Sequence, residues 1–358
     1  MALGGDAPRR AAIVGTGLIG ASIGLALRER GWQVVGTDQD ESVAAEALSR
    51  RALDAVGPPT GADIVFVATP VGAAAAEARK ALDAGAGLVT DVGSVKAPIV
   101  GAVDDRRFVG GHPMAGSEQE GVAGARANLF ANAVWVLTPT EETDDGALVQ
   151  IRSVVASLGA DVVSLAPERH DALVAVVSHV PHLTAATLMA MADERSEEHR
   201  AMLRLAAGGF RDMTRIASGN PGIWPDICQE NAEAICSVLD RFIDALGEVR
   251  SLVSSGDRGG LLALLEQARA ARLHLPSGLD RDVTLAEVRV RVFDRPGELA
   301  RITSLTTDVG ANIYDLEIAH SVEGGEGVAI LVVNEEMADS LAEALGRQGY
   351  NPTVGVLS

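Results

Sequence analysis

The stretch AAIVGTGLIGASIGLAL, residues 11–27, decides the fold of the first half of this chain. A β-branched run leads into three glycines spaced G-x-G-x-x-G, and an apolar helical pattern follows. In this setting the first glycine permits a tight turn, the second admits a pyrophosphate, and the third lets helix and strand pack closely. The helix N-terminus then faces the phosphate charge. The predicted dinucleotide site comprises Gly15, Gly17, Leu18, Ile19 and Gly20.

An acid at the end of the second strand-like run indicates which dinucleotide binds. Asp38, in VVGTDQD, lies about 20 residues beyond the glycines, where a carboxylate bonds both ribose hydroxyls. It would repel a 2′-phosphate, and no arginine follows it nearby, so NAD is favoured over NADP. Thr69, after the next long strand-like run, is a further predicted cofactor contact. The alternatives are a tight turn without ligand and a flavin, and the low aromatic content disfavours the flavin.

The composition excludes several classes of function. At 358 residues the chain suggests two or three domains, and its apolar content of 47% is enough for sizeable cores. A formal charge of −19 argues against a nucleic-acid or anionic-membrane partner, because both need basic surface. There is no apolar leader and no apolar run of about 18 residues, so no membrane span is expected. Two cysteines in one expected helix, Cys228 and Cys236, fit a reduced, cytoplasmic protein.

Three domains are expected along the chain. Residues 1–166 alternate strands with helices, which predicts an α/β fold with a Rossmann-type, doubly wound, mainly parallel sheet. Its strands are expected at 11–15, 33–38, 62–70, 87–94, 107–113, 133–139 and 160–166. Residues 167–276 show apolar spacing of three and four, which predicts an all-helical domain with breaks at Pro181, at Gly208-Gly209 and at 219–225. Its surplus of apolar residues favours burial against a second subunit, in a homodimer.

The last part of the chain returns to a strand-like pattern. After a linker over residues 277–284, residues 285–358 follow the order βαββαβ, with a hairpin around Gly324 and Gly325. This order predicts a small α+β unit of the ferredoxin-like kind.

Four motifs follow the glycine loop: TDVGSVK (90–96), GGHPMAGSE (110–118), VSHVPH (177–182) and GFRDMTRIASGNPGIW (209–224). In this order the chain closely resembles the prephenate/arogenate dehydrogenase family from residue 11 onward. The C-terminal unit, with DRPGELARI and GANI, resembles an ACT domain, a regulatory module that binds amino acids. The resemblance implies oxidative decarboxylation of prephenate to 4-hydroxyphenylpyruvate in tyrosine biosynthesis, with hydride passing from the ring carbon that bears the hydroxyl to NAD.

The histidine of the second motif is the predicted base. His112 follows the end of an expected strand, where ligands bind in doubly wound sheets. An ordinary pKa near 6.5 lets it accept a proton at pH 7, and the resemblance puts it at the ring hydroxyl of the substrate. Its neighbouring glycines would leave room for substrate; a histidine that only caps a turn is the alternative. Ser94 could bond His112 and the substrate hydroxyl, cap the helix that follows it, or do both.

Other site residues are implied by the same resemblance. Ser117 and Glu118 would line the pocket of His112, with His182 near the substrate and His179 near the cofactor. The two histidines could ligate a metal, but no third ligand is suitably spaced, so no metal is expected; core packing is the other alternative for each. Lys96 is taken either as structural or as a support behind the residues that contact substrate.

A dianionic substrate needs a cation, since the net charge of the chain opposes its binding. Arg215, in DMTRIA, is the predicted anchor because a guanidinium bonds a carboxylate in a two-pronged way. Asp212 would orient Arg215 or His182, and Trp224 would pack in the wall of the site or in an interface.

The expected regulatory residues lie in the ACT-like unit. Asp294, Pro296, Gly297 and Asn312 match the loops that contact an amino acid, and tyrosine is the expected feedback effector. The alternative is that the segment with Gly310 simply ends a helix before the next strand.

Three rival functions are weighed. An arogenate dehydrogenase differs only in whether the substrate side chain bears an amino or a keto group. A β-hydroxyacid or 6-phosphogluconate-type dehydrogenase would need a lysine base on the helical domain, but residues 169–250 contain no lysine. A non-catalytic, NAD-responsive amino-acid sensor would not need His112, Ser94 and Arg215 together. No fused chorismate mutase segment is expected.

Overall fold

The computed structural model describes residues 9–117, 119, 121–193, 208–273, 285–293, 295–320 and 326–357. The chain divides into two compact units, Met1–Gly247 and Glu248–Ser358. The expected linker at 277–284, the hairpin turn at Gly324 and Gly325, and two site residues, Glu118 and Asp294, lie outside the described residues. The expected domain boundaries stay predictions.

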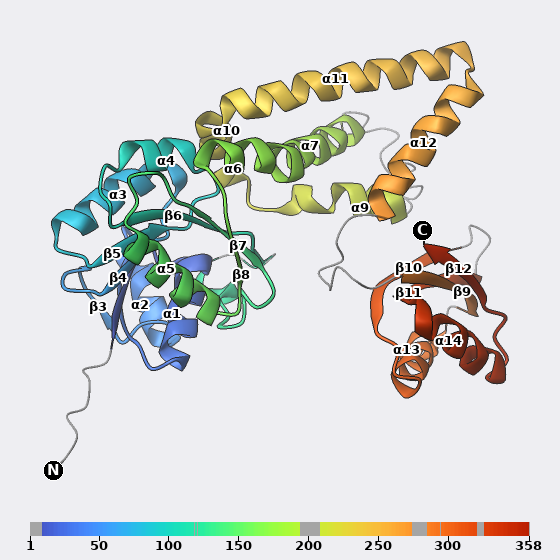
Figure 1. Cartoon of the computed structure of the whole chain (residues 1–358), viewed down its shortest axis with the longest axis horizontal. Coiled ribbons are helices and arrows are strands. Elements are labelled where there is room, and N and C mark those ends of the chain that lie inside the picture. The colour runs from blue at the N-terminus through green and yellow to red at the C-terminus, as the bar shows by residue number, and fades with distance from the viewer. Residues whose placement is uncertain are drawn as a thin grey trace. The chain divides into compact units, whose positions relative to one another are not determined.

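An eight-stranded sheet is the centre of the first unit (Figure 1). Its spatial order is β3-β2-β1-β4-β5-β6-β7-β8. Neighbours are parallel except β6 and β7, so β7 and β8 run opposite to the other six. The strands are β1 (Arg10–Val14), β2 (Gln33–Thr37), β3 (Ala55–Val56), β4 (Ile64–Val67), β5 (Leu88–Asp91), β6 (Phe108–Pro113), β7 (Val134–Thr138) and β8 (Asp161–Ser164).

Helices cover both faces of this sheet, which confirms the Rossmann-like expectation. One apolar core unites α1 (Leu18–Glu29), α2 (Glu41–Ser49) and α5 (Asp145–Ser157) with side chains such as Ile13, Phe66 and Trp135. The other unites α3 (Val71–Asp83) and α4 (Ala97–Ala102) with the opposite sides of the same strands. The strand order reverses between β1 and β4, and a crevice for ligands is expected at such a point.

A helical region follows the sheet in the first unit. It contains α6 (Pro167–Val174), a π-helical turn (Ala175–His179), α7 (Val180–Asp193), α9 (Gly208–Thr214), short 3-10 turns at Arg215–Ser218 and Pro221–Ile223, α10 (Trp224–Glu230) and the start of α11 (Ala232–Ser255), whose residues from Glu248 on belong to the second unit. The expected break at 219–225 is present between the 3-10 turns and α10. Cys228 and Cys236 lie in separate helices rather than one, as free thiols, and Cys236 is exposed.

The expected helix break at Pro181 is wrong. The chain runs without interruption from α6 through the π-helical turn into α7, where Pro181 is the second residue. A proline lacks the amide hydrogen that a first helical turn leaves unpaired, and the wider π turn places it at such a position. By length and composition alone, the resulting helix, Pro167–Ala192, is long and apolar enough to cross a membrane, but a core helix passes the same test, so the expectation of no span stays a prediction.

The second unit contains α12 (Arg258–Leu273) and a four-stranded antiparallel sheet. Its order is β10-β11-β9-β12, with every neighbouring pair antiparallel. The elements are β9 (Leu285–Phe293), α13 (Glu298–Asp308), β10 (Ile313–His320), β11 (Glu326–Asn334), α14 (Glu335–Arg347) and β12 (Thr353–Leu357). The order βαββαβ is confirmed, and apolar residues such as Val288, Ile302 and Leu341 form its core.

Candidate active site

The glycine loop has the local geometry that the sequence predicts. Gly15 has φ +91°, and a Cβ there would lie 2.5 Å from the carbonyl oxygen of Ala68. A Cβ on Gly20 would lie 2.0 Å from the carbonyl oxygen of Gly15, so helix α1 can approach the strand only with glycine at this position. Space is open around Gly17, the N-cap of α1, where no side chain caps the helix.

Asp38 and Thr69 flank this loop at the ends of β2 and β4. The amide of Thr16 donates to Oδ2 of Asp38 (2.7 Å), and the amide of Asp40 donates to Oδ1 (3.1 Å). The carboxylate is therefore fixed beside the glycine loop with lone pairs left to accept from a ribose. The Oγ1 of Thr69 is buried and lacks a hydrogen-bond partner among the described residues. These residues fit a dinucleotide, because an open backbone, a fixed acceptor and an unpaired hydroxyl meet at the switch point.

His112 lies at the end of β6, opposite Val136 of β7. Its ring is half-buried, and its Nδ1 lies 2.8 Å from Nε2 of His170 in α6. The Nδ1 of His170 lies in turn 2.7 Å from Oδ1 of Asp171. Sequence reasoning did not find His170 or Asp171. The available signal was the His-Asp pair in PERHDALV, directly before a long apolar helical stretch, since such groups are buried only when hydrogen-bonded.

Asp171 is held in place by backbone and side-chain donors. The amide of Lys96 donates to Oδ1 (2.7 Å), and the amide of Ala97 donates to Oδ2 (2.8 Å). The side-chain amide of Asn231 donates to the carbonyl oxygen of Asp171 (3.0 Å). His170 is fully buried and Asp171 nearly so. The carboxylate therefore contacts two backbone amides in addition to Nδ1 of His170, which together fix its orientation.

A second buried pair, Lys96 and Asp91, contacts the backbone near the end of β6. The ammonium of Lys96 binds the carboxylate of Asp91 and the carbonyl oxygen of Gly111 (2.8 Å). Oδ1 of Asp91 accepts from the amide of Gly111 (3.1 Å). Burial lowers the pKa of Lys96, while the charge of Asp91 opposes that shift. Lys96 thus has a structural role: it holds the backbone at Gly111, the residue before His112.

The glycines before His112 serve packing rather than substrate. A Cβ on Gly110 would lie 2.4 Å from Oγ1 of Thr138, and one on Gly111 would lie 2.7 Å from the carbonyl oxygen of Asp91. Both glycines are buried. The expectation that they make room for substrate is therefore wrong at these two positions: they let β6 approach β5 and β7.

The environment of His112 keeps its imidazole neutral. Burial, followed by the charges of His170, Lys96 and His179, lowers the pKa of His112 well below its ordinary value. A neutral imidazole has one ring nitrogen free to accept a proton. The ordinary pKa assumed from sequence is thus replaced by a lower one, which extends the neutral form to more acidic pH.

Ser94 lies half-buried between β5 and α4. The helix begins at Ala97 with Lys96 as its N-cap, so the interpretation of Ser94 as a helix cap is wrong. Within the described residues the hydrogen bond of the His112 ring goes to His170, and none joins it to Ser94.

His179 and His182 both contact Trp224. The ring of His182 stacks on Trp224, with centroids 3.6 Å apart and planes at 15°. His179 is buried, with its ring edge-on to Trp224 at 6.1 Å, and its Nδ1 lies 3.2 Å from the side-chain amide nitrogen of Asn231. Burial lowers the pKa of His179 to about 4 and lowers that of His182. No group of three or more metal-ligating side chains occurs in the described part of the chain.

Arg215 and Ser117 are the other predicted substrate contacts that the structure describes. Arg215 begins the 3-10 turn after α9 and is exposed. This turn packs beside α7, and a Cβ on its capping residue, Gly219, would lie 3.8 Å from Cε1 of His182. Asp212 is exposed on α9. The hydroxyl of Ser117, in the loop after β6, accepts from the amide of Gln119 (3.1 Å).

The ACT-like unit holds the predicted regulatory residues on exposed loops. Gly297 has φ +89° and is the N-cap of α13, next to exposed Pro296, and Asn312 precedes β10. Gly310 has φ +74° and follows the last turn of α13, where its amide donates to the carbonyl of Thr307 (3.0 Å). Gly310 therefore ends the helix, as the alternative interpretation expected.

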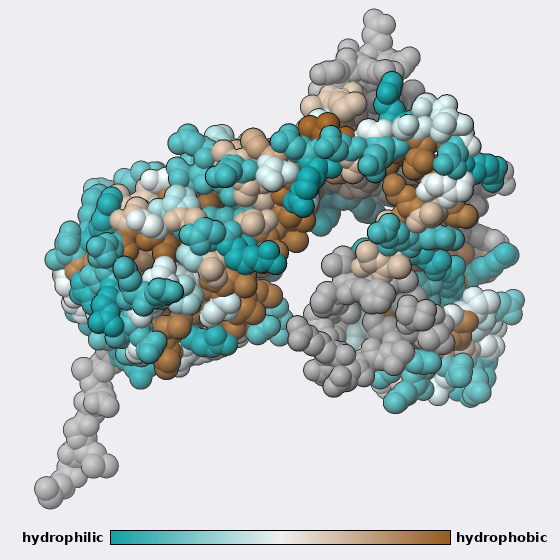
Figure 2. Space-filling view, turned by 45° about the horizontal axis from the view of Figure 1, so that its top comes forward, coloured by the Kyte–Doolittle hydropathy of each residue, from teal (hydrophilic) through white to brown (hydrophobic). Residues whose placement is uncertain are grey.

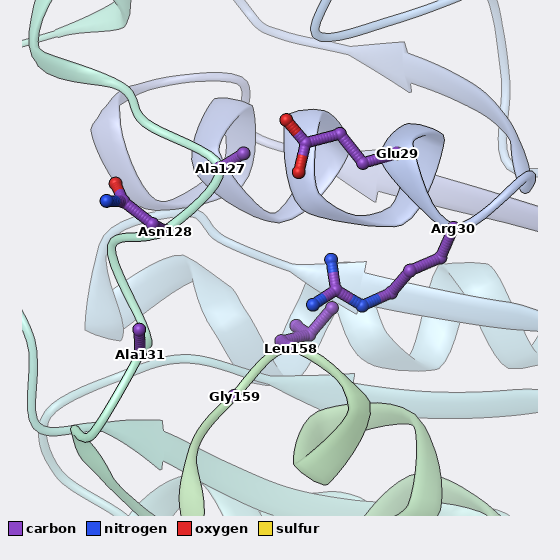
Figure 3. Close-up of a pocket in the computed structure, with 7 residues that line it drawn as sticks. All are labelled: Glu29, Arg30, Ala127, Asn128, Ala131, Leu158 and Gly159. Atoms are coloured by element: carbon purple, nitrogen blue, oxygen red, sulfur yellow. The ribbon is translucent and has the colours of Figure 1, made fainter.

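A cavity of about 440 Å³ in the first unit shares no lining residue with the predicted site. Figure 3 shows Glu29 and Arg30 at the end of α1, facing Asn128 and the turn at Leu158 and Gly159. The guanidinium of Arg30 donates to the carbonyl oxygens of Ala26 and Ser157. Its donors are thus partly used within the chain.

Comparison with known proteins gives consistent matches. The family profile "Prephenate dehydrogenase, nucleotide-binding domain" matches residues 23–164, and "Prephenate dehydrogenase, dimerization domain" matches residues 166–267. The prephenate dehydrogenase of Bacillus subtilis is 33% identical over 332 residues, which cover 88% of this chain and 90% of that protein.

Two solved structures are similar over a shorter part of the chain. Prephenate dehydrogenase from A. aeolicus, in complex with hydroxyphenyl propionate and NAD+, has a TM-score of 0.70 and 31% identity, covering 75% of this chain and 98% of its own. Synechocystis arogenate dehydrogenase has a TM-score of 0.64 and 34% identity, covering 74% and 98%.

Proposed function

This chain belongs to the prephenate dehydrogenase family, and from that premise we propose its reaction and the residues that carry it. It is an NAD-dependent dehydrogenase of that family. The reaction is the oxidative decarboxylation of prephenate to 4-hydroxyphenylpyruvate. Loss of carbon dioxide leaves an aromatic ring, so the chemistry is downhill once the hydride has left.

The NAD site is formed at the ends of β1, β2 and β4. The open backbone at Gly17 would receive the pyrophosphate, and Asp38 would accept from the ribose hydroxyls. The hydroxyl of Thr69, which has no hydrogen-bond partner within the described part of the chain, and the ring of His179 complete the proposed contacts. When bound, the nicotinamide supplies the hydride acceptor.

His112 is the proposed base at the ring hydroxyl. The observation that carries this role is a half-buried, neutral imidazole at the end of β6, with Nδ1 occupied by His170. Its Nε2 is then the nitrogen available to the substrate. General base catalysis contributes about 10²–10⁴ in rate, which sets the expected loss without it.

The substrate contacts are assigned by motif and placement. Arg215 would hold a carboxylate, because its 3-10 turn lies beside the α7 segment that bears His182. His182, fixed by its stack on Trp224, would bond the substrate on the side of the helical region. Ser94, Ser117 and Glu118 are further proposed contacts; Ser94 would bond the substrate hydroxyl.

Exchange of His112 for asparagine tests the base. We expect His112→Asn to lower kcat by about 10²-fold or more while the Kd for NAD, measured by calorimetry, stays near that of the unaltered enzyme. Thr138→Val is a matched control beside β6, since it removes a buried hydroxyl without a partner among the described residues. If His112→Asn turned over prephenate at the original kcat, the proposed role would be wrong.

Arogenate is the second candidate substrate. The similarity to an arogenate dehydrogenase at 34% identity favours testing it alongside prephenate. Steady-state kcat/KM for both substrates, each with NAD and NADP, separates these alternatives. A non-catalytic, NAD-responsive sensor would bind NAD without turnover in every combination.

A homodimer is proposed for the helical region. Apolar side chains are exposed on several of its helices, and Figure 2 shows brown, apolar residues interrupting the hydrophilic surface there. The exposed residues in the first unit include Val176, Val177, Met191, Ile243 and Leu246. The helix Pro167–Ala192 is apolar, yet little of its surface is covered within one chain. Burial against a second copy of the chain would account for this. Light scattering that gave a monomer at micromolar concentration would contradict this.

The C-terminal unit is proposed to be an ACT domain with tyrosine as its effector. Its ferredoxin-like order supports the assignment. Asp294, Pro296, Gly297 and Asn312 would contact the amino acid. A cytoplasmic location stays a prediction. Addition of tyrosine during steady-state turnover tests the feedback, and unchanged KM and kcat would contradict it.

A further inference from the structure

We propose that His170 and Asp171 form a proton relay with His112, which fixes its tautomer and carries the charge that it gains. This inference rests on the proposed function, since it assumes that His112 is the base. Three side chains from two elements form one line of hydrogen bonds, with 2.8 Å between the histidine rings and 2.7 Å to the carboxylate.

The direction of each hydrogen bond follows from the acceptor at the end of the line. The carboxylate of Asp171 can only accept, so Nδ1 of His170 donates to it. A neutral His170 then has a lone pair on Nε2, which accepts from Nδ1 of His112. The neutral His112 therefore has its lone pair on Nε2. The relay thus selects the one tautomer that can take a proton at that nitrogen.

The far end of the relay is a fixed anion. Asp171 accepts from the amides of Lys96 and Ala97 in addition to His170. These donors set the orientation of the carboxylate before substrate binds. An imidazolium at position 170 would thus form directly beside a negative charge that requires no rearrangement.

The proton transfer balances without any further reactant. The proton of the substrate hydroxyl passes to Nε2 of His112, and the hydrogen on Nδ1 of His112 passes to Nε2 of His170. His170 is then an imidazolium between His112 and the Asp171 carboxylate, and no electrons move along the line. After product leaves, the proton on Nε2 of His170 returns to Nδ1 of His112, and the proton on Nε2 of His112 passes to solvent.

The surroundings explain why His112 needs this help. Burial, more than any neighbouring charge, lowers the pKa of His112, so the isolated ring is a weak base. The ammonium of Lys96 faces this region but binds Asp91 and Gly111. His179 accepts from Asn231 and stands outside the line. Asp171 is thus the anion that contacts the His170 ring directly, and transfer of charge toward it offsets the weak basicity of His112.

Two substitutions at one position separate the two roles of the relay. His170→Gln retains an amide oxygen that can accept from His112 and fix its tautomer, but it cannot carry a proton. His170→Phe fills the buried space and does neither. Removal of the group that orients a catalytic histidine costs about 10⁴-fold in serine proteases. We expect about 10²-fold or more loss of kcat for phenylalanine and about tenfold for glutamine.

The measurements are kcat, KM for prephenate and Kd for NAD. The tautomer of His112 is measured from the ¹⁵N NMR spectrum of the full chain with ¹⁵N-labelled histidine. We expect KM and Kd to change less than about threefold in both variants. The spectrum should place hydrogen on Nδ1 of His112 in the original enzyme and in His170→Gln, and move it to Nε2 in His170→Phe. Thr138→Val should keep the original kcat.

Two results would overturn the relay. One is an unchanged kcat in His170→Phe. The other is a loss of kcat that comes with equal loss of NAD and prephenate binding while the tautomer of His112 stays the same, which is the pattern of a structural role. His112→Asn separates failure of the relay from failure of the proposed base. If His112→Asn loses kcat while His170→Phe does not, the relay is wrong but the base assignment stands. If His112→Asn keeps kcat, the base assignment itself fails.

Discussion

His179 should make the first unit sensitive to acid. Its ring is 1% exposed, and its Nδ1 faces the side-chain nitrogen of Asn231, which also donates to the carbonyl oxygen of Asp171. An amide nitrogen only donates, so Nδ1 must keep its lone pair. Burial lowers the pKa of His179 to about 4 from 6.5. Between these two values the unfolded chain binds a proton that the folded chain does not, so stability falls as pH falls.

The size of this effect follows from the shift. A fall from 6.5 to about 4, at about 1.36 kcal/mol per pKa unit, corresponds to a loss on the order of 3 kcal/mol once the pH is below both values. At pH 5 the linkage relation gives about 2 kcal/mol of that loss. At pH 7.5 the loss is close to zero because neither state binds the proton.

Urea unfolding from pH 7.5 to pH 5 measures the effect, with His179→Asn as the matched variant. Asparagine can offer Oδ1 to Asn231 near the position of Nδ1 and does not titrate. Trp224 lies edge-on to His179, so its fluorescence reports on this region. The free energy of unfolding of the original chain, relative to the variant, should fall by about 2 kcal/mol over this range. A difference that stays constant with pH, or that rises on acidification, would refute the reasoning.

Three further substitutions have expected outcomes. Arg215→Gln should raise the KM for prephenate about tenfold or more and leave kcat within a few-fold, because one amide cannot replace a two-pronged hydrogen bond; a loss confined to kcat would contradict the anchor. Asp38→Ser should raise the KM for NAD and improve kcat/KM for NADP, since the carboxylate that repels a 2′-phosphate is gone, and an unchanged ratio of the two would count against it. Gly15→Ala should lower the free energy of unfolding by more than about 2 kcal/mol, because its φ of +91° and the nearby carbonyl of Ala68 exclude a Cβ; chemical denaturation with near-original stability would show that the loop relaxes.

Much of the fold followed from local patterns. The seven expected strands of the large sheet are present, since most are β-branched runs bounded by turn residues. Strand β3 was not expected because its two residues, Ala55 and Val56, are exposed and too short to show a period. Pro181 was interpreted as a break because sequence rules do not include a π-helical turn that brings a proline to the start of the next helix.

The site was only partly predictable. The glycine loop and Asp38 depend on short-range geometry, so their spacing was enough. The bond between His112 and His170 joins positions 58 apart in sequence, and only the packing of α6 on the sheet brings the rings together. Gly110 and Gly111 were assigned to substrate access, but a Cβ at these positions would clash with Thr138 and Asp91. These two neighbours are distant in sequence and come close only in the folded chain.

Turnover of prephenate by the purified full chain with NAD tests the central claim most directly. NADH is followed by absorbance, and 4-hydroxyphenylpyruvate and carbon dioxide are quantified in the same reaction. We expect one NADH and one carbon dioxide for each 4-hydroxyphenylpyruvate formed, with little rate when NADP replaces NAD. Absence of NADH with both prephenate and arogenate, from protein that binds NAD, would contradict the assignment.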